Sequence, residues 1–127
     1  MKNFLCLALL LSTLSLTFTL CRTRDCNNIP KSFSSKPEAL KIIKGSSFKV
    51  KDSIDVNSQY IKSANYYSCD GQTGFFVYAA TSGSEYFNSN VPIELWREFK
   101  KTSLKDSFYE REIGKYRTAI IVDVIIR

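Results

Sequence analysis

Apolar residues follow one another almost without interruption from Phe4 to Leu20, and the first charge after Lys2 is Arg22. A helix that spans a bilayer needs about 20 apolar residues, whereas this run is shorter and includes several serines and threonines. A short positive start followed by such a run is typical of a signal peptide. We therefore expect residues 1–21 to direct export and to be removed, with a retained membrane anchor as the alternative.

Cys21 stands directly after the apolar run, where the lipid-modified cysteine of a bacterial lipoprotein would stand. The preceding residue is Leu20, however, and lipoprotein signals usually carry Gly, Ala or Ser at that position. The sequence therefore favours a periplasmic or secreted protein. A lipid anchor on Cys21 is the alternative.

The segment 22–57 combines a polar leader, a helix and an extended stretch. Ser35 and Glu38 match a capping box, in which the serine accepts from a backbone N–H and the glutamate reaches back. A helix with a short apolar stripe should follow and end at Gly45. Beyond it, residues 47–56 alternate apolar and polar side chains, which predicts an exposed edge strand or an extended connector.

A hairpin and a further strand follow. Residues 61–67 are rich in β-forming side chains, and the loop from Asp70 to Gly74 supplies residues that tolerate positive φ. The chain can therefore reverse into residues 75–80. A second reversal at 82–84 leads into 85–88, so the pattern predicts a three-stranded antiparallel meander.

Two helices are expected to cover one face of this sheet. Pro92 opens the first, in which Trp96 and Phe99 share the apolar face, and residues 103–116 form the second. Residues 117–127 are strongly β-forming and too short to span a bilayer as a helix. They predict an added strand at the sheet edge, with a sorting or docking tail as the alternative. The sequence thus indicates an α+β domain.

Cys26 and Cys69 are the two cysteines certain to remain after the signal is removed. In an oxidising compartment such a pair is more often a disulfide than a metal site. The chain has no histidine and no CxxC spacing from which a zinc site could be built. We therefore predict a disulfide between Cys26 and Cys69 and no metal site. Pairing of Cys21 with Cys26 is the alternative.

Basic residues outnumber acidic ones, 18 Lys and Arg against 12 Asp and Glu, for a net charge of +6. Removal of the signal takes away only the charge of Lys2, so the mature chain stays basic. This balance favours anionic surfaces as partners. Simple solubility is the alternative reason for it.

Catalysis has little support in the sequence. Without histidine, the commonest general base and the Ser-His-Asp and Cys-His constellations are missing. The remaining catalytic candidate is a pair of carboxylates, Asp70 with Glu85 or Glu94. Asp70 is also what a turn requires, and Glu94 suits the start of a helix. No glycine-rich phosphate loop precedes a helix, so we predict a non-catalytic protein without a cofactor.

Several residues occur in the order of one known family. They are Ile61-Lys62-Ser63 before the first strand, Tyr66, the Asp70-Gly71 turn, the aromatic strand 75–78, Tyr86, Val91-Pro92, Ser103, Phe108-Tyr109 and the closing residues 113–116. Over residues 58–116 the chain thereby resembles the KTSC domain, which is also found at the C-terminus of some lysyl-tRNA synthetases. The role of this family is not established, so the resemblance implies a fold, in an exported bacterial single-domain form, and no reaction.

The chain departs from the KTSC pattern at four positions. Asn88 stands where the family has a second tyrosine, Lys105 and Asp106 stand where a glycine is expected, and Glu110 replaces an asparagine. These differences weaken the transfer of a binding site and leave the implied fold mostly intact.

Binding is the class of function that the sequence favours. The link to a tRNA synthetase implies RNA as one ligand, because sheet tyrosines can stack on bases and basic helix residues can contact phosphates. The candidate ligand-binding residues are Lys62, Tyr66, Tyr78, Tyr86, Arg97, Lys100, Lys101 and Lys105.

Two considerations limit the RNA hypothesis. An exported protein rarely meets RNA, and aromatic residues on a small sheet such as Tyr66, Phe75, Trp96 and Phe99 more often belong to a hydrophobic core than to a stacking platform. We therefore expect an exported, non-catalytic binding module for an unidentified anionic or protein partner. An RNA- or other nucleic-acid-binding domain is the alternative.

Overall fold

The computed structural model describes residues 23–116 and residue 118. The predicted signal peptide and, except for Thr118, the predicted C-terminal strand lie outside these residues. Within the described part of the chain, no helix is long and apolar enough to cross a membrane. In chain order the elements are β1 (Arg24–Asp25), η1 (Cys26–Asn28), α2 (Lys36–Gly45), β2 (Ser46–Ser47), β3 (Val50–Asp55), β4 (Ile61–Ser68), β5 (Thr73–Ala80), β6 (Glu85–Pro92), α3 (Ile93–Lys101), α4 (Lys105–Phe108) and η2 (Tyr109–Ile113).

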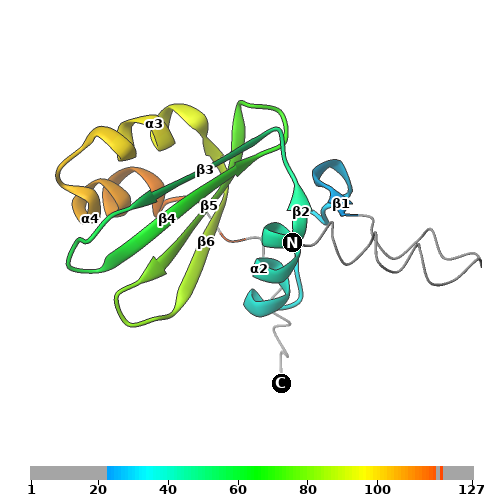
Figure 1. Cartoon of the computed structure of the whole chain (residues 1–127), viewed down its shortest axis with the longest axis horizontal. Coiled ribbons are helices and arrows are strands. Elements are labelled where there is room, and N and C mark those ends of the chain that lie inside the picture. Colours follow the sequence, from blue (N-terminus) through cyan, green and yellow to red (C-terminus); the bar gives the residue numbers. More distant parts are fainter. Residues whose placement is uncertain (1–22, 117, 119–127) are drawn as a thin grey trace, which may run out of the picture.

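Four antiparallel strands form the main sheet in the order β3-β4-β5-β6 (Figure 1). The predicted meander corresponds to β4, β5 and β6. The stretch expected as an edge strand or connector adds the fourth strand, β3, which pairs with β4 from Val50 opposite Ser68 to Asp55 opposite Ser63. The α+β class is therefore confirmed, and the predicted sheet lacked one strand. A separate parallel pair is formed by β1 and β2.

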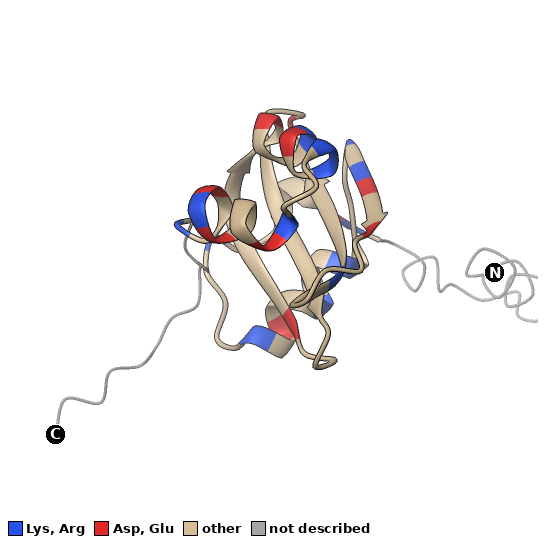
Figure 2. Ribbon diagram, turned by 90° about the vertical axis from the view of Figure 1, so that its left-hand side faces the viewer, with Lys and Arg blue, Asp and Glu red and all other residues tan. Residues whose placement is uncertain are grey.

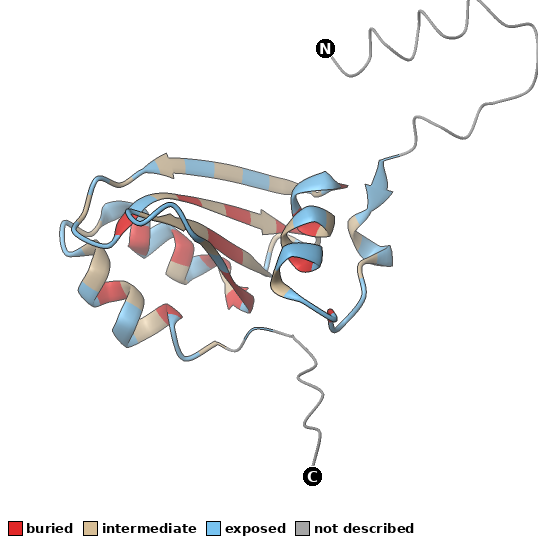
Figure 3. Ribbon diagram, turned by 90° about the horizontal axis from the view of Figure 1, so that it is seen from below, coloured by how far each residue is buried: buried red, intermediate tan, exposed pale blue. Residues whose placement is uncertain are grey.

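Helices cover both faces of the main sheet (Figures 1 and 3). Successive strand residues point to opposite faces, so the same strands fill two cores. One core lies under α3, α4 and η2 and includes Tyr66, Phe76 and Trp96. The other lies against α2 and includes Val77 and Phe87. The sequence pattern predicted a cover for one face only, and α2 supplies the second.

The start of α2 follows the predicted capping box with one change. The Ser35 hydroxyl accepts a hydrogen bond from the N–H of Glu38 (3.3 Å). The Glu38 carboxylate, however, accepts from the hydroxyl and the N–H of Ser34, one residue before the cap. These two bonds lower the pKa of Glu38. Gly45 is the last residue of the helix, as predicted.

The helix predicted over residues 103–116 is shorter and has two parts. The single turn α4 continues directly into the π-helical turn η2, and Phe108 and Ile113 are buried. After η2, the carbonyl of Tyr116 accepts a hydrogen bond from the Asn88 side chain of β6 (2.7 Å). Tyr116 is therefore anchored to the edge strand of the sheet.

Candidate functional site

A hollow of about 490 Å³ lies where residues 59–61 and 78–82 meet α4 and η2. Its lining includes three aromatic residues, Tyr60, Tyr78 and Tyr109, and two carboxylates, Asp106 and Glu110. Tyr60 is 62% exposed. A hollow of this volume is within the range of sites that hold small molecules.

Hydrogen bonds from three segments of the chain fix the rim of the hollow. Asp106 accepts from the Ser58 hydroxyl (2.7 Å) and from the N–H of Tyr60 (3.4 Å). Thr81 donates its N–H to the carbonyl of Tyr60 (3.0 Å) and its hydroxyl to the carbonyl of Gln59 (3.0 Å). The exposed ring of Tyr60 is therefore carried by a backbone that is tied to both β5 and α4.

Tyr78 and Tyr109 form an aromatic wall of the hollow. Their ring centroids are 4.8 Å apart, with the planes at 63°. The Tyr109 hydroxyl donates to Asn88 Oδ1 (2.9 Å). Burial, followed by the nearby Tyr109 hydroxyl, raises the pKa of Tyr78 above its usual value, so its phenol stays protonated and uncharged.

Tyr66, one of the three tyrosines predicted to stack on a ligand, lies in the core. It is fully buried, stacks on Trp96 with centroids 5.6 Å apart, and donates its hydroxyl to the carbonyl of Val91 (2.6 Å). Neither face of the ring is open to a ligand. This corrects the expectation that Tyr66 is a stacking platform and agrees with the core alternative.

The other predicted sheet residues are only partly brought together. Tyr86 stacks on Tyr78 with centroids 5.3 Å apart, but Lys36 of α2 places its ammonium 4.2 Å from the centroid of the Tyr86 ring. Lys62 is exposed on β4 and does not line the hollow. Of the predicted sheet residues, Tyr78 alone therefore contributes to the hollow's lining.

The predicted basic residues of the C-terminal helices divide into two pairs. Lys100 forms an ion pair with Asp52 (2.6 Å), and Lys105 donates to two carbonyls at the end of α3, including that of Lys100 (3.2 Å). Desolvation lowers the pKa of Lys105. Arg97 and Lys101 are exposed and make no ion pair within the described chain. Figure 2 shows that charged residues gather on the helices, while the central strands carry few.

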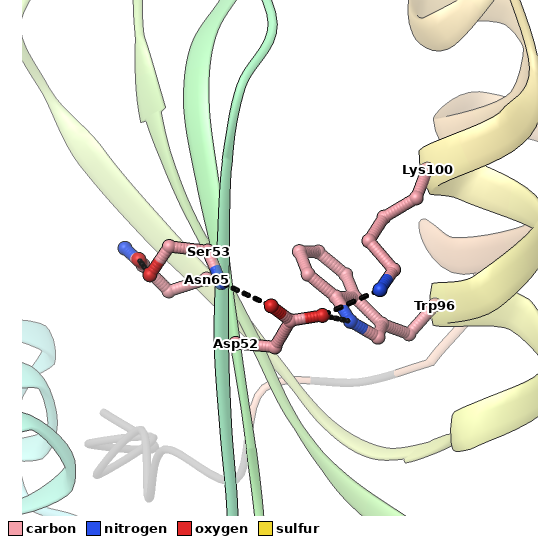
Figure 4. Close-up of polar contacts among 5 residues, drawn as sticks. All are labelled: Asp52, Ser53, Asn65, Trp96 and Lys100. Atoms are coloured by element: carbon pink, nitrogen blue, oxygen red, sulfur yellow. Dashed lines mark hydrogen bonds and ion pairs between the residues drawn. The ribbon is translucent and has the colours of Figure 1, made fainter.

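Asp52 connects the edge strand β3 to α3 (Figure 4). Its Oδ2 accepts a hydrogen bond from the ammonium of Lys100 (2.6 Å) and from the indole N–H of Trp96 (2.9 Å). Trp96 is 1% exposed, so its N–H depends on this acceptor. The bonds from Lys100, and then from Trp96, hold the pKa of Asp52 below its usual value of 3.8.

Replacing Asp52 with alanine should lower the free energy of unfolding by about 1–3 kcal/mol, because a buried N–H then loses its acceptor. Asp52→Asn keeps an acceptor oxygen and removes the charge, so the loss should be smaller. Urea unfolding of both variants measures the two effects. Equal losses for the two variants would contradict a role for Asp52 as the acceptor of Trp96.

The same carboxylate should make stability depend on pH. A lowered folded pKa means that the charge contribution is complete above pH 3.8 and is lost as the pH falls through the folded pKa. The difference between wild type and Asp52→Asn should therefore shrink from neutral pH to about pH 2.5. A difference that stays constant over this range would show that the charge contributes nothing.

Two of the carboxylates considered for catalysis have structural partners: Asp70 stabilises its own turn, and Glu85 forms an ion pair with Lys44. Asp70 accepts from two backbone N–H groups of its own turn, which lowers its pKa. Glu85 stands opposite Ala79, whereas Asp70 precedes Thr73, so the two acids lie at opposite ends of β5. Six strand residues span about 20 Å, too far for both to act on one bond. Glu94 is an exposed residue in the first turn of α3.

The predicted disulfide between Cys26 and Cys69 is present, with the Cα atoms 5.7 Å apart. Cys26 begins η1 and Cys69 directly follows β4, so the bond ties the N-terminal leader to the turn between β4 and β5. The alternative pairing with Cys21 is excluded because Cys26 is already bonded. Asp25 lies beside the two sulfurs, but both cysteines are taken by the disulfide.

A scan against protein-family models finds no match for this chain, and searches of the curated proteins and of the solved structures find none either. The class of molecule is therefore defined by its own structure. It is a small α+β domain with an antiparallel sheet covered on both faces, a disulfide-tethered leader and an aromatic hollow where the start of β4 and the end of β5 meet α4 and η2.

Sequence reasoning missed four lining residues of the hollow, Tyr60, Asp106, Tyr109 and Glu110. One signal was available, because Asp106 and Glu110 are four residues apart and such residues share a helix face. The sequence does not show that this face meets the start of β4 and the end of β5. That information comes from the pairing of the strands.

Proposed function

We propose that this protein is an exported, non-catalytic binding module whose residues 58–116 form a KTSC-like domain, and that the hollow beside Tyr60 is its ligand site. The observation that carries the proposal is the exposed aromatic ring of Tyr60 on a rim fixed by Asp106 and Thr81. Large exposed rings beside a preformed hollow are typical of ligand sites. The disulfide supports export to an oxidising compartment, periplasmic or secreted.

Nucleic acid is the alternative ligand, and the geometry gives it less support. Tyr86 lies in β6, whereas Lys100 is bound to Asp52 in β3, and these are opposite edges of the sheet. The stacking residues and the basic residues therefore do not form one surface. Of the predicted helix cations, Arg97 and Lys101 of α3 are exposed and form no ion pair among the described residues, so they can meet an anionic ligand.

Titration with a panel of small probes tests the proposed site. The panel consists of N-acetyl amino acid methylamides that carry acidic, basic, apolar and aromatic side chains, with a single-stranded RNA oligonucleotide added. We expect at least one methylamide to shift the backbone NMR signals of Tyr60, Thr81 and Ser107 together. Tyr60→Ala should weaken this binding by about fivefold, because a stacked ring is lost.

The control is Leu104→Ala, which removes a 69% exposed apolar side chain outside the hollow and should leave the affinity unchanged. Shifts with RNA alone, centred on Arg97 and Lys101, would replace the proposal with the nucleic-acid alternative. An absence of shifts around the hollow with every methylamide would overturn the proposal.

A further inference from the structure

The hollow is acidic in a protein that is otherwise basic. Asp106 and Glu110 line it, and among the residues that the structure describes no lysine or arginine does, although the whole chain has a net charge of +6. The other lining residues are uncharged, with aromatic, hydroxyl, amide and apolar side chains. Negative charge in a concave wall that holds no cation attracts ligands of positive charge.

The two carboxylates are placed differently in the hollow. The oxygens of Asp106 each accept one hydrogen bond, from Ser58 and from Tyr60 N–H. A carboxylate oxygen has a second lone pair, so this fixed group can accept from a ligand as well. Glu110, one turn further along, is exposed and has no hydrogen bond or ion pair among residues 23–116 and 118. The hollow therefore has one carboxylate, Asp106, whose position is fixed by hydrogen bonds, and one, Glu110, that can adjust to a ligand.

Aromatic rings complete the cation-binding character of the hollow. Tyr60, Tyr78 and Tyr109 all line it, and Tyr60 is 62% exposed. The face of an aromatic ring carries negative charge density and attracts ammonium and guanidinium groups. The chain already makes this contact at a neighbouring ring, where Lys36 lies 4.2 Å from the centroid of Tyr86. The volume of about 490 Å³ is far larger than a metal ion requires.

We propose that the hollow binds an organic cation, an alkylammonium or guanidinium group, between the ring of Tyr60 and the carboxylates of Asp106 and Glu110. This inference rests on the proposed function, because it names the ligand of that same site. The cation can come from a lysine or arginine side chain of another polypeptide or from a free polyamine. Both sources present the same group to the hollow.

Two probes of similar shape, one charged and one neutral, test whether the positive charge of a ligand contributes to binding. N-acetyl-lysine methylamide and its uncharged counterpart N-acetyl-norleucine methylamide have side chains of similar length. NMR titration of the full mature chain should give at least about tenfold tighter binding for the lysine probe, with shifts at Tyr60, Thr81 and Ser107. Glu110→Gln should weaken the lysine probe by about threefold to fivefold and leave the norleucine probe unchanged.

The control variant is Glu98→Gln, which removes an exposed carboxylate of α3 outside the hollow and should not alter binding. Equal affinity for the lysine and norleucine probes, or an unchanged lysine affinity in Glu110→Gln, would overturn the cation inference while leaving the binding site intact. Loss of all shifts with every probe would overturn the site itself. Titrations with spermidine and with a Gly-Gly-Lys-Gly-Gly peptide then distinguish the two sources. The probe with the higher affinity shows whether the hollow binds a free polyamine or a side chain of another polypeptide.

Discussion

Replacing both Cys26 and Cys69 with serine is expected to lower the free energy of unfolding by about 4 kcal/mol. The disulfide joins residues 43 positions apart, so its removal frees a long loop in the unfolded chain and increases its entropy. For a domain of this size, a loss of this magnitude lowers the melting temperature by about 15–30 °C. Urea unfolding of the oxidised wild type and of the double variant measures the difference.

Reduced wild type is the internal control for this experiment, because it lacks the bond but keeps both sulfur atoms. It should unfold at the same urea concentration as the double variant. Peptide mapping of exported protein without reductant should recover Cys26 and Cys69 in one linked peptide pair. Recovery as separate free thiols, or a double variant as stable as the oxidised wild type, would contradict a stabilising disulfide.

Gly74→Ala is expected to cost about 3 kcal/mol or more and to disrupt the pairing of β4 with β5. A Cβ atom at Gly74 would lie 2.8 Å from the carbonyl carbon of Tyr67 and 3.0 Å from the Cα of Ser68. These are backbone atoms of the paired strand, which cannot turn aside as a side chain would. Urea unfolding and the near-ultraviolet signal of the packed aromatic residues measure the effect.

Gly45→Ala is the matched control. A Cβ atom there meets nothing within 4 Å, and Gly45 is the last residue of α2. Alanine should therefore be neutral or add about 0.4–1 kcal/mol, because it reduces the freedom of the unfolded chain. If Gly74→Ala is tolerated as well as Gly45→Ala, the close approach of β5 to Tyr67 is refuted.

Local sequence signals predicted much of the fold. The capping serine Ser35, the terminating Gly45 and the turn around Asp70 all act through neighbours within a few residues, so the sequence alone identifies them. The disulfide was also predictable, because the predicted signal peptide and the count of cysteines left few alternatives. The pairing of β3 with β4 joins residues 8 to 18 positions apart, and alternation alone did not distinguish a paired strand from a connector.

The candidate site was less accessible to sequence reasoning for the same physical reason. A tyrosine can lie in a core or at a surface, and the sequence does not distinguish the two. The packing of the folded chain shows that Tyr66 is buried and Tyr60 is exposed. A sequence does not show whether a lysine on a helix has an ion-pair partner. The ion pair between Lys100 and Asp52 arises because β3 lies against α3, which the pattern of neither segment reveals.

The two cores of the sheet differ in size, with ten buried residues in the one under α3 and five in the one under α2. Layers with less buried apolar surface open at a lower free energy than the molecule as a whole. The covalent bond between Cys26 and Cys69 lies beside the smaller layer, near Phe48 and Phe75. The tether therefore keeps the leader attached to the sheet whenever the smaller layer opens, so that layer can close again without searching for its place on the sheet.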